Sequence, residues 1–273
     1  MADISLSAGI RSNLLSLQGT SSLLGRTQER LGTGRKVNSA IDNPSNYFTA
    51  ESLNNRAGDL SSRLDGITKG IQTIKAADTG IKGITTFIGQ LKGIVNDALG
   101  TSSTTDRQTL QSRYNDVINQ ISQLAEDSGY DGVNLLGSGS LTVEFSEKAG
   151  DASLGVTGFS GNATAADLAI GTQGAGFTDN GALTTALTAL EAATSKLRTK
   201  SRELSTNLSI LTTRQDFTKN LVNTLQSGSD KLTLADLNEE GANLLALNTQ
   251  NSLAVQSLSL SSQAAASVLR IIG

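Results

Sequence analysis

Two glycine-rich runs are the first stretches of the sequence that could do chemistry, because glycine loops can bring backbone N–H groups around a phosphate. GTGRK occupies residues 32–36, and GTQGAG occupies residues 171–176. Neither run follows a buried strand and opens a helix within a βαβ unit, and the sequence has no GxxxxGK[ST] loop. We therefore interpret these glycines as turn residues and predict no nucleotide site.

Acid–base and nucleophilic catalysis are the next possibilities. Glu239 and Glu240 are adjacent carboxylates, but neighbouring residues of a helix point about 100° apart and do not converge on a substrate. A solvated helix face is expected for this pair. A nucleophilic serine would need a lysine base, and no SxxK motif supplies one. The Asn-x-Ser/Thr matches at Asn162 and Asn207 are short patterns that arise by chance.

The composition excludes several classes of protein. The chain has no Cys and no His, so it has no disulfide, no thiolate or imidazole metal site, and no usual general base near neutral pH. We therefore predict that it is not an enzyme and holds no cofactor and no metal. A net charge of -3 with scattered Lys and Arg gives no basic face for nucleic acid.

Targeting signals are also missing from the sequence. No run of about 18 apolar residues is present, so membrane insertion is not expected. Residues 1–25 lack a basic start followed by a continuous apolar block, so they do not resemble a cleavable secretory signal. Composition and targeting alone would indicate a cytoplasmic protein.

Stripes of aliphatic residues along the sequence predict the helices of the chain. With six Phe, three Tyr and no Trp, the interior must be filled by Leu, Ile, Val and Ala repeated along an axis. Apolar residues spaced alternately by three and four predict helices, which lie within residues 10–31, 60–95, 110–124, 183–211 and 232–272. The predicted fold class is mainly α, an elongated antiparallel helical bundle or coiled coil with paired N- and C-terminal helices.

Residues 137–180 depart from this pattern. The stretch is rich in glycine, and LTVEF at residues 141–145 alternates with period two, so a small β-rich insert is predicted. Three domains are expected. They are a terminal helical domain of residues 1–40 with 235–273, a helical rod domain of residues 41–136 with 181–234, and the insert at residues 137–180.

The terminal stripes are candidates for an assembly surface, whereas the middle stripes are expected to form an intramolecular bundle. Narrow seams with many Ser, Asn and Gln bury little area against a backbone ordering cost of roughly 1–2 kcal/mol per residue. We therefore expect the chain ends to become ordered when copies pack together. The residues predicted to form the assembly surface are Ile10, Leu14, Leu17, Leu24, Leu31, Leu244, Val255, Leu258, Leu269 and Ile272.

The only proline of the chain lies in TGRKVNSAIDNPSNY, residues 33–47. Pro44 cannot continue a helix interior, and it restricts Asn43 to extended geometry, so the chain is expected to change direction there.

Three stretches of the chain resemble bacterial flagellins. LGTGRKVNSAIDNPSNYFTAESL at residues 31–53 resembles the N-terminal signature, NSLAVQSLSLSSQAAASVLRIIG at residues 251–273 resembles the C-terminus, and YDGVNLL at residues 130–136 resembles the FNG-x-x-LL turn. The resemblance covers both ends and the rod, and it leaves the insert unmatched. It implies that a spoke joins an inner tube of terminal helices to an outer tube of rods, and the spoke residues here are Gly34, Asn38, Asp42, Asn43 and Pro44.

The resemblance implies a structural subunit that self-assembles into the helical flagellar filament used for swimming. Such a subunit leaves the cell through a dedicated export channel without losing a signal peptide, so a secreted protein of the extracellular flagellum is expected. Its partners would be further copies of itself, a flagellar export chaperone, the filament cap and hook-associated proteins.

One stretch departs from the family. Many flagellins carry an Arg-x-Arg-Glu-Leu run that an animal innate-immune receptor grips, and the corresponding residues here are Gln90, Leu91, Lys92, Gly93 and Ile94. Because the bidentate and charge-assisted contacts of the two arginines and the glutamate are missing, weak receptor recognition is predicted.

Two alternative functions stay open on the sequence. A hook–filament junction protein shares flagellin-like ends but should stop at short assemblies. A secreted coiled-coil adaptor should have stable helical ends in the monomer and form a small oligomer of defined size.

Overall fold

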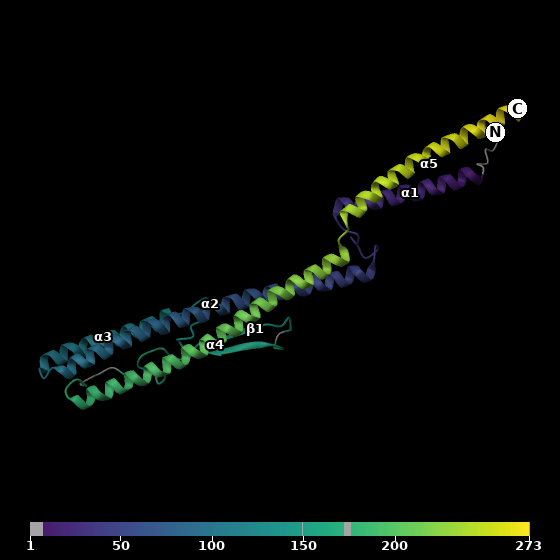
Figure 1. Cartoon of the computed structure of the whole chain (residues 1–273). Coiled ribbons are helices and arrows are strands. Elements are labelled where there is room, and N and C mark those ends of the chain that lie inside the picture. Colours follow the sequence, from purple (N-terminus) through teal and green to yellow (C-terminus); the bar gives the residue numbers. More distant parts are fainter. Residues whose placement is uncertain (1–7, 149, 172–175, 273) are drawn as a thin grey trace. The chain divides into compact units, whose positions relative to one another are not determined.

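The computed structural model describes residues 8–148, 150–171 and 176–272 (Figure 1). The chain is mainly α, as predicted, with one small antiparallel hairpin. Its elements in chain order are α1 (Ala8–Thr33), α2 (Pro44–Gly100), α3 (Thr104–Asp127), β1 (Ser140–Glu144), β2 (Ser153–Thr157), α4 (Asn180–Thr233) and α5 (Leu237–Ile272). In the part of the chain that the structure describes, no helix is both long enough and apolar enough to cross a membrane.

The chain packs as two compact units. One comprises residues 1–55 with 225–273, here called the terminal unit, and the other comprises residues 56–224, here called the central unit. Each unit is described by itself below. The division into three domains that the sequence suggests stays a prediction.

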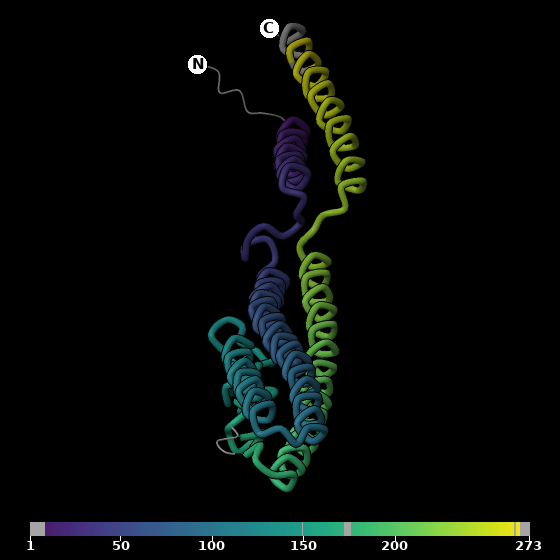
Figure 2. Tube along the Cα trace, turned by 90° about the vertical axis from the view of Figure 1, so that its left-hand side faces the viewer, coloured from purple at the N-terminus to yellow at the C-terminus, as the bar shows by residue number. Residues whose placement is uncertain are grey.

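The central unit holds the hydrophobic core. Helices α2, α3 and α4 lie side by side (Figure 2), and their stripe residues, such as Ile74, Leu91 and Leu190, are fully buried. One aromatic pair joins this aliphatic interior, because the Tyr114 and Phe177 rings meet edge to face with centroids 5.4 Å apart. The stripes of the middle helices therefore form an intramolecular core.

Helix α2 approaches its neighbours closely at Gly70, Gly80 and Gly83, and a Cβ atom on Gly70 would lie 2.6 Å from Cγ2 of Val143. A Cβ atom on Gly80 would lie 2.7 Å from Cβ of Ser128 and 2.5 Å from Cδ1 of Leu136, and one on Gly83 would lie 2.7 Å from Cδ2 of Leu124. At Gly80 a Cβ atom would collide with the Cβ atom of Ser128, close to the backbone, whereas at Gly83 only the flexible end of the Leu124 side chain would have to shift.

The glycine-rich stretch packs onto the helices of the central unit. In its hairpin, Leu141 pairs with Val156 and Val143 pairs with Leu154. Val143 and Val156 are buried, while the residues that alternate with them face outward. The stretch adds further buried side chains to the core, namely Phe145, Phe159, Ala163, Leu168, Ile170 and Phe177.

The terminal unit is built on a pair of helices, α1 and α5, which lie side by side in both views (Figures 1 and 2). Arg30 of α1 contacts Glu240 of α5, and Asn13, which comes earlier in α1, donates a hydrogen bond to Ser257, which comes later in α5. The two helices are therefore antiparallel. The predicted pairing of N- and C-terminal helices is confirmed.

Candidate assembly interface

The seam between α1 and α5 is partly polar. Its half-buried and buried residues on α1 are Ile10, Asn13, Leu17, Thr20, Leu24, Thr27, Arg30 and Leu31. Those on α5 are Glu240, Gly241, Leu244, Leu247, Asn251, Ala254, Leu258 and Ser261. Leucines thus alternate with small polar residues, and the apolar area that the pair buries is correspondingly limited.

The seam of α1 differs from the predicted stripe at three positions. The prediction placed Leu14 in the stripe, but Leu14 is 38% exposed and its neighbour Asn13 is half-buried. Thr20 and Thr27 are also buried, whereas the heptad spacing from Ile10 would instead place residues 21 and 28 in the seam. The sequence periodicity leaves open which of two adjacent residues faces the partner, and only the contact with α5 selects one.

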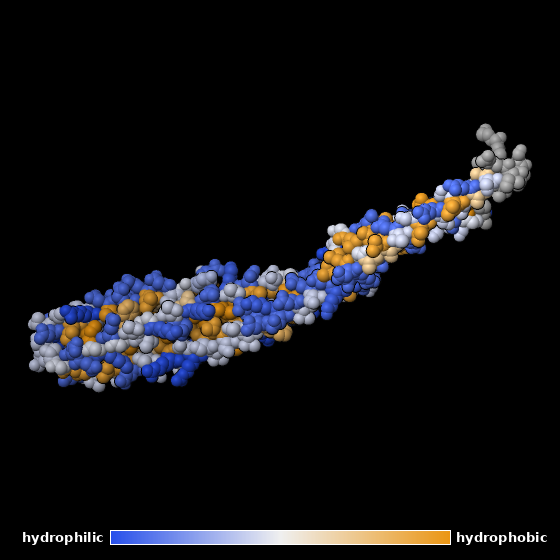
Figure 3. Space-filling model, turned by 45° about the horizontal axis from the view of Figure 1, so that its top comes forward, coloured by the Kyte–Doolittle hydropathy of each residue, from blue (hydrophilic) through white to orange (hydrophobic). Residues whose placement is uncertain are grey.

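Large apolar side chains that lie outside the seam remain exposed on both terminal helices. Leu15, Leu245 and Leu260 are 68%, 72% and 67% exposed, and Figure 3 shows apolar patches along these helices. We call the following residues the outer apolar set: Leu14, Leu15, Leu23, Leu245, Leu253, Val255 and Leu260. So many exposed leucines on two helices are typical of a surface that another protein covers.

The central unit differs in this respect. Among its described residues, the exposed large apolar side chains are Tyr130, Ile210 and Phe217. A candidate assembly interface therefore lies on the terminal helices, as the sequence suggested, although its members differ in part.

The structure divides the predicted assembly residues into three groups. Most of them lie in the seam, namely Ile10, Leu17, Leu24, Leu31, Leu244 and Leu258. Leu14 and Val255 belong to the outer apolar set. The side chains of Leu269 and Ile272 lie outside the described residues. The assembly role of all ten residues stays a prediction.

Sequence reasoning missed five members of the outer apolar set. They are Leu15, Leu23, Leu245, Leu253 and Leu260. The signal was present in the sequence, because a leucine that falls off the heptad stripe must be exposed if the helix has only one partner.

The turn after α1 is tied to the connection between α4 and α5. Gly34 has a φ of 69°, a left-handed conformation that glycine adopts without steric cost. Its carbonyl accepts a hydrogen bond from the N–H of Ala235 at 3.0 Å, and the N–H of Lys36 donates to the carbonyl of Thr233 at 2.8 Å. The two connections of the terminal unit therefore hold each other in place.

The sequence placed a domain boundary between residues 234 and 235, within this second connection, but it did not predict where the last helix begins. The sequence stripe suggested one segment from residue 232 to residue 272, whereas α4 ends at Thr233 and α5 begins at Leu237. Asp236 caps α5, because its Oδ1 accepts hydrogen bonds from the N–H groups of Asn238 at 2.9 Å and Glu239 at 3.3 Å. An Asp followed three residues later by Glu is a helix-start pattern that could have been read.

The predicted spoke residues lie together in residues 34–44. The Oδ2 atom of Asp42 accepts hydrogen bonds from the N–H groups of Asn38 and Ser39, both at 3.0 Å, and from the Ser39 hydroxyl at 3.1 Å. The backbone hydrogen bonds from Ser39 and Asn38 lower the pKa of Asp42 below its usual 3.8. This carboxylate therefore organises the turn.

Pro44 begins helix α2. The side-chain oxygen of Asn43 accepts a hydrogen bond from the N–H of Asn46 at 3.0 Å, so Asn43 is the N-cap. Proline at the first helical position lacks only an N–H group that would have no helical partner. The change of direction expected at the proline is thus also the start of the next helix. Whether these residues act as a spoke stays a prediction.

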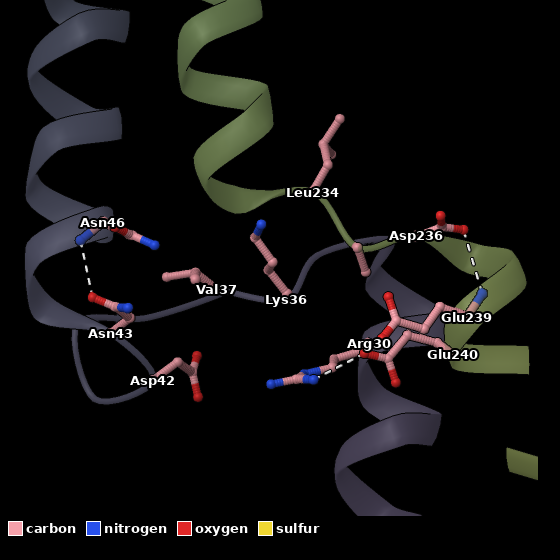
Figure 4. Close-up of a pocket in the computed structure, with 11 residues that line it drawn as sticks. Arg30, Lys36, Val37, Asp42, Asn43, Asn46, Leu234, Asp236, Glu239 and Glu240 are labelled. Atoms are coloured by element: carbon pink, nitrogen blue, oxygen red, sulfur yellow. Dashed lines mark hydrogen bonds and ion pairs between the residues drawn. The ribbon is translucent and has the colours of Figure 1, made fainter. Parts of the chain in front are cut away.

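An open pocket of about 410 Å³ lies beside these connections (Figure 4). Arg30 and Glu240 form an ion pair on its wall, with 2.8 Å between Nη1 and Oε1. The expectation of a solvated helix face is wrong for Glu240, which is buried, although Glu239 is exposed. The error arose because the partner of Glu240 belongs to a helix at the other end of the sequence.

The pocket does not gather a metal-binding set. Across the described part of the chain, no three side chains of His, Cys, Asp and Glu are grouped so that they could hold a metal ion. Three carboxylates of the pocket have other roles, because Asp236 caps α5, Asp42 accepts backbone hydrogen bonds and Glu240 pairs with Arg30.

The stretch that corresponds to the receptor-binding run lies on α2 in the central unit. Gln90 and Gly93 are exposed, Lys92 and Ile94 are half-buried, and Leu91 is fully buried in the core. Its recognition properties stay a prediction.

The chain is similar to known proteins along most of its length. A family model described as the bacterial flagellin N-terminal helical region matches residues 5–141. Flagellin FljK of Caulobacter vibrioides is 31% identical to this chain over 98% of the chain and 97% of that protein. A flagellin of Brucella melitensis is 28% identical over 99% of each. The crystal structure of a Bacillus cereus flagellin covers 55% of this chain and 86% of its own, with 16% identity and a TM-score of 0.47.

The pairing of the N- and C-terminal helices and these matches together place the chain in the class of structural proteins of bacterial flagella. The chain belongs to the bacterial flagellin family. The function that the resemblance implied, a subunit of the flagellar filament, is confirmed.

Proposed function

We propose that the chain builds a helical homopolymer and that its terminal helix pair is the element through which copies assemble. The outer apolar set carries this proposal, since its leucines face water in the isolated chain. Covering apolar surface gains about 25 cal/mol per Å², so each further copy that packs against these helices is stabilising. The polar seam supports the proposal too. Because the helix pair buries little apolar area by itself, packing against neighbouring copies adds a large share of its stability.

The chain acts as a structural subunit and not as an enzyme. The function of its family and the capping and pairing roles of the pocket carboxylates support this reading. No observation favours the hook–filament junction protein or the coiled-coil adaptor.

The subunit is secreted and resides in the extracellular flagellum. Before assembly its exposed leucines need a cover, which a flagellar export chaperone would provide; the filament cap and hook-associated proteins would contact its ends in the growing structure. Family membership supports these partners. Innate-immune receptor recognition is weak, because Gln90, Lys92, Gly93 and Ile94 offer no bidentate arginine contact.

Electron microscopy of the purified full chain after salt-induced polymerisation tests this function. We expect long helical filaments from the natural sequence. Leu253→Asp should abolish them, because it places an unpaired charge in a surface that becomes buried. The matched control is Leu253→Met, which keeps an apolar side chain and should polymerise normally. Normal filaments from Leu253→Asp, or only short assemblies from the natural chain, would contradict the proposal.

A further inference from the structure

Ile41 is the most exposed large apolar residue of the described chain, at 93%. It lies at the tip of a β-turn, in which the N–H of Asp42 donates to the carbonyl of Ser39 at 3.2 Å. A single exposed apolar side chain is ordinary on a protein surface. This one is unusual because of how firmly its turn is held.

The turn around Ile41 is held on both sides. Before it, the N–H of Val37 donates to the carbonyl of Thr233 at 3.2 Å, and Val37 itself is buried. Within and after it, Asp42 accepts three hydrogen bonds and Asn43 caps α2. Ile41 is therefore displayed in a fixed position, and little conformational freedom is lost when it binds a partner.

The central unit carries an apolar groove whose size suits a side chain such as that of Ile41. Its volume is about 240 Å³, below the roughly 300–1,000 Å³ of small-molecule sites, so it suits one or two side chains. Its apolar lining comes from α2, the hairpin and α4, namely Leu60, Phe145, Ala152, Phe217 and Leu221. Phe217 is 56% exposed, so this lining is open to a partner.

The rim of the groove is polar and carries charges of both signs, Arg56, Glu147 and Arg214. The guanidinium of Arg214 lies over the Phe145 ring, 5.1 Å from its centroid, and Arg56 pairs with Glu147. An apolar centre with a charged rim is the usual anatomy of a protein–protein contact. The carboxylate of Asp42, next to Ile41, is opposite in charge to Arg214.

We propose that Ile41 of one copy of the chain inserts into the groove formed by Leu60, Phe145 and Phe217 of another copy. The occupant is a second copy because the chain is a filament subunit, and because Asp42 complements Arg214 in charge. A protrusion and a groove at different places on one chain give a heterologous contact, which repeats without closing and so extends a filament. The inference rests on the proposed function.

Cross-linking tests the contact directly, since the chain has no cysteine of its own. One chain carries Ile41→Cys, the other carries Phe217→Cys, and the two are copolymerised and oxidised or treated with a short thiol cross-linker. We expect a covalent dimer of the two chains whose link joins positions 41 and 217 by mass spectrometry. Lys219→Cys is the matched control for Phe217→Cys, because Lys219 is exposed on the same helix and does not line the groove.

A second measurement uses the critical concentration for polymerisation. From the transfer energy of one isoleucine side chain, Ile41→Ser should raise it about tenfold to a hundredfold. Phe217→Ser should act similarly, and the double variant should be no worse than the stronger single one, because both remove one contact. Circular dichroism of each monomer checks that the fold is kept.

Three results would overturn the contact. The first is cross-linking to Phe217→Cys that is no greater than cross-linking to the Lys219→Cys control. The second is a disulfide that forms within a single dilute chain carrying both cysteines. The third is an unchanged critical concentration for Ile41→Ser. Each of these can occur while the natural chain forms normal filaments, in which case the proposed function stands. If the natural chain forms no filaments, the proposed function itself fails.

Discussion

The guanidinium of Arg30 lies 2.8 Å from the carboxylate of Glu240, and the Glu240 side chain is only 9% exposed. The pair joins the last turn of α1 to the first turn of α5. A cation near a helix C-terminus and an anion near a helix N-terminus both complement the helix dipoles. This ion pair therefore stabilises two helix ends and fixes how they meet.

Removing one partner of this ion pair should loosen the helix pair. Glu240→Ala leaves Arg30 unpaired, and we expect a loss of roughly 1–3 kcal/mol, less than for a fully buried pair because Arg30 is 37% exposed. Amide hydrogen exchange of α1 and α5 measures the effect. Glu239→Ala removes an exposed carboxylate and should change protection by less than about 0.5 kcal/mol. Equal effects of the two substitutions would show that the ion pair is unimportant.

The turn at residues 38–43 should depend on pH through Asp42. The hydrogen bonds from Ser39 and Asn38 lower its pKa below 3.8 in the folded chain, so the folded turn holds the proton less tightly than the unfolded chain does. The stabilisation is therefore complete above that value and is lost as the pH falls through the lowered pKa. NMR shifts of the Asn38 and Ser39 amides should follow this titration, and Asp42→Asn should abolish it. An identical acid titration in Asp42→Asn would contradict the assignment.

Two leucines of α1 should respond differently to a charge. Leu17 is half-buried against α5, so Leu17→Asp should break the helix pair and also prevent polymerisation. Leu15 is 68% exposed, so Leu15→Asp should leave the pair intact and prevent only polymerisation. Hydrogen exchange of the monomer and sedimentation of the polymer separate these outcomes. If Leu15→Asp chains sediment as the natural chain does, Leu15 does not belong to the interface.

The terminal helices should be the least protected part of the dilute chain. The hydrophobic core lies in the central unit, from Ile67 to Leu211, whereas the seam of α1 and α5 contains Thr20, Thr27 and Asn251. We expect rapid amide exchange in α1 and α5 of the monomer and slow exchange in the filament. Equal protection of all five helices in the monomer would refute ordering on assembly.

Two glycines of α2 give a matched test of close packing. In Gly80→Ala the new Cβ would collide with Ser128 and Leu136, and we expect a loss of about 1–3 kcal/mol in the free energy of unfolding. Gly89 has open space around its Cβ position, so Gly89→Ala should stabilise the helix by up to about 1 kcal/mol. Thermal unfolding of the monomer measures both. A loss in both variants would mean that close approach is not the cause.

Much of the fold follows from the sequence because hydrophobic periodicity is a local property. The spacing of Ile67, Ile74 and Leu91 predicted one face of a helix, and all three are fully buried in the core. Alternation in residues 141–145 likewise predicted the strand β1. These patterns depend only on residues within a few turns of each other, so no knowledge of the partner was needed.

The candidate site depended on contacts between distant parts of the chain. Whether Asn13 or Leu14 faces α5 follows from the rotation of one helix against another, and a heptad pattern tolerates either. Glu240 is buried because Arg30 comes from the opposite end of the sequence, and the turn after α1 is anchored on Thr233. The sequence by itself determined the helical stripes, one strand of the hairpin and the family. Only the tertiary structure decided which polar groups pair and which leucines remain exposed, because each of those outcomes depends on a partner far away along the chain.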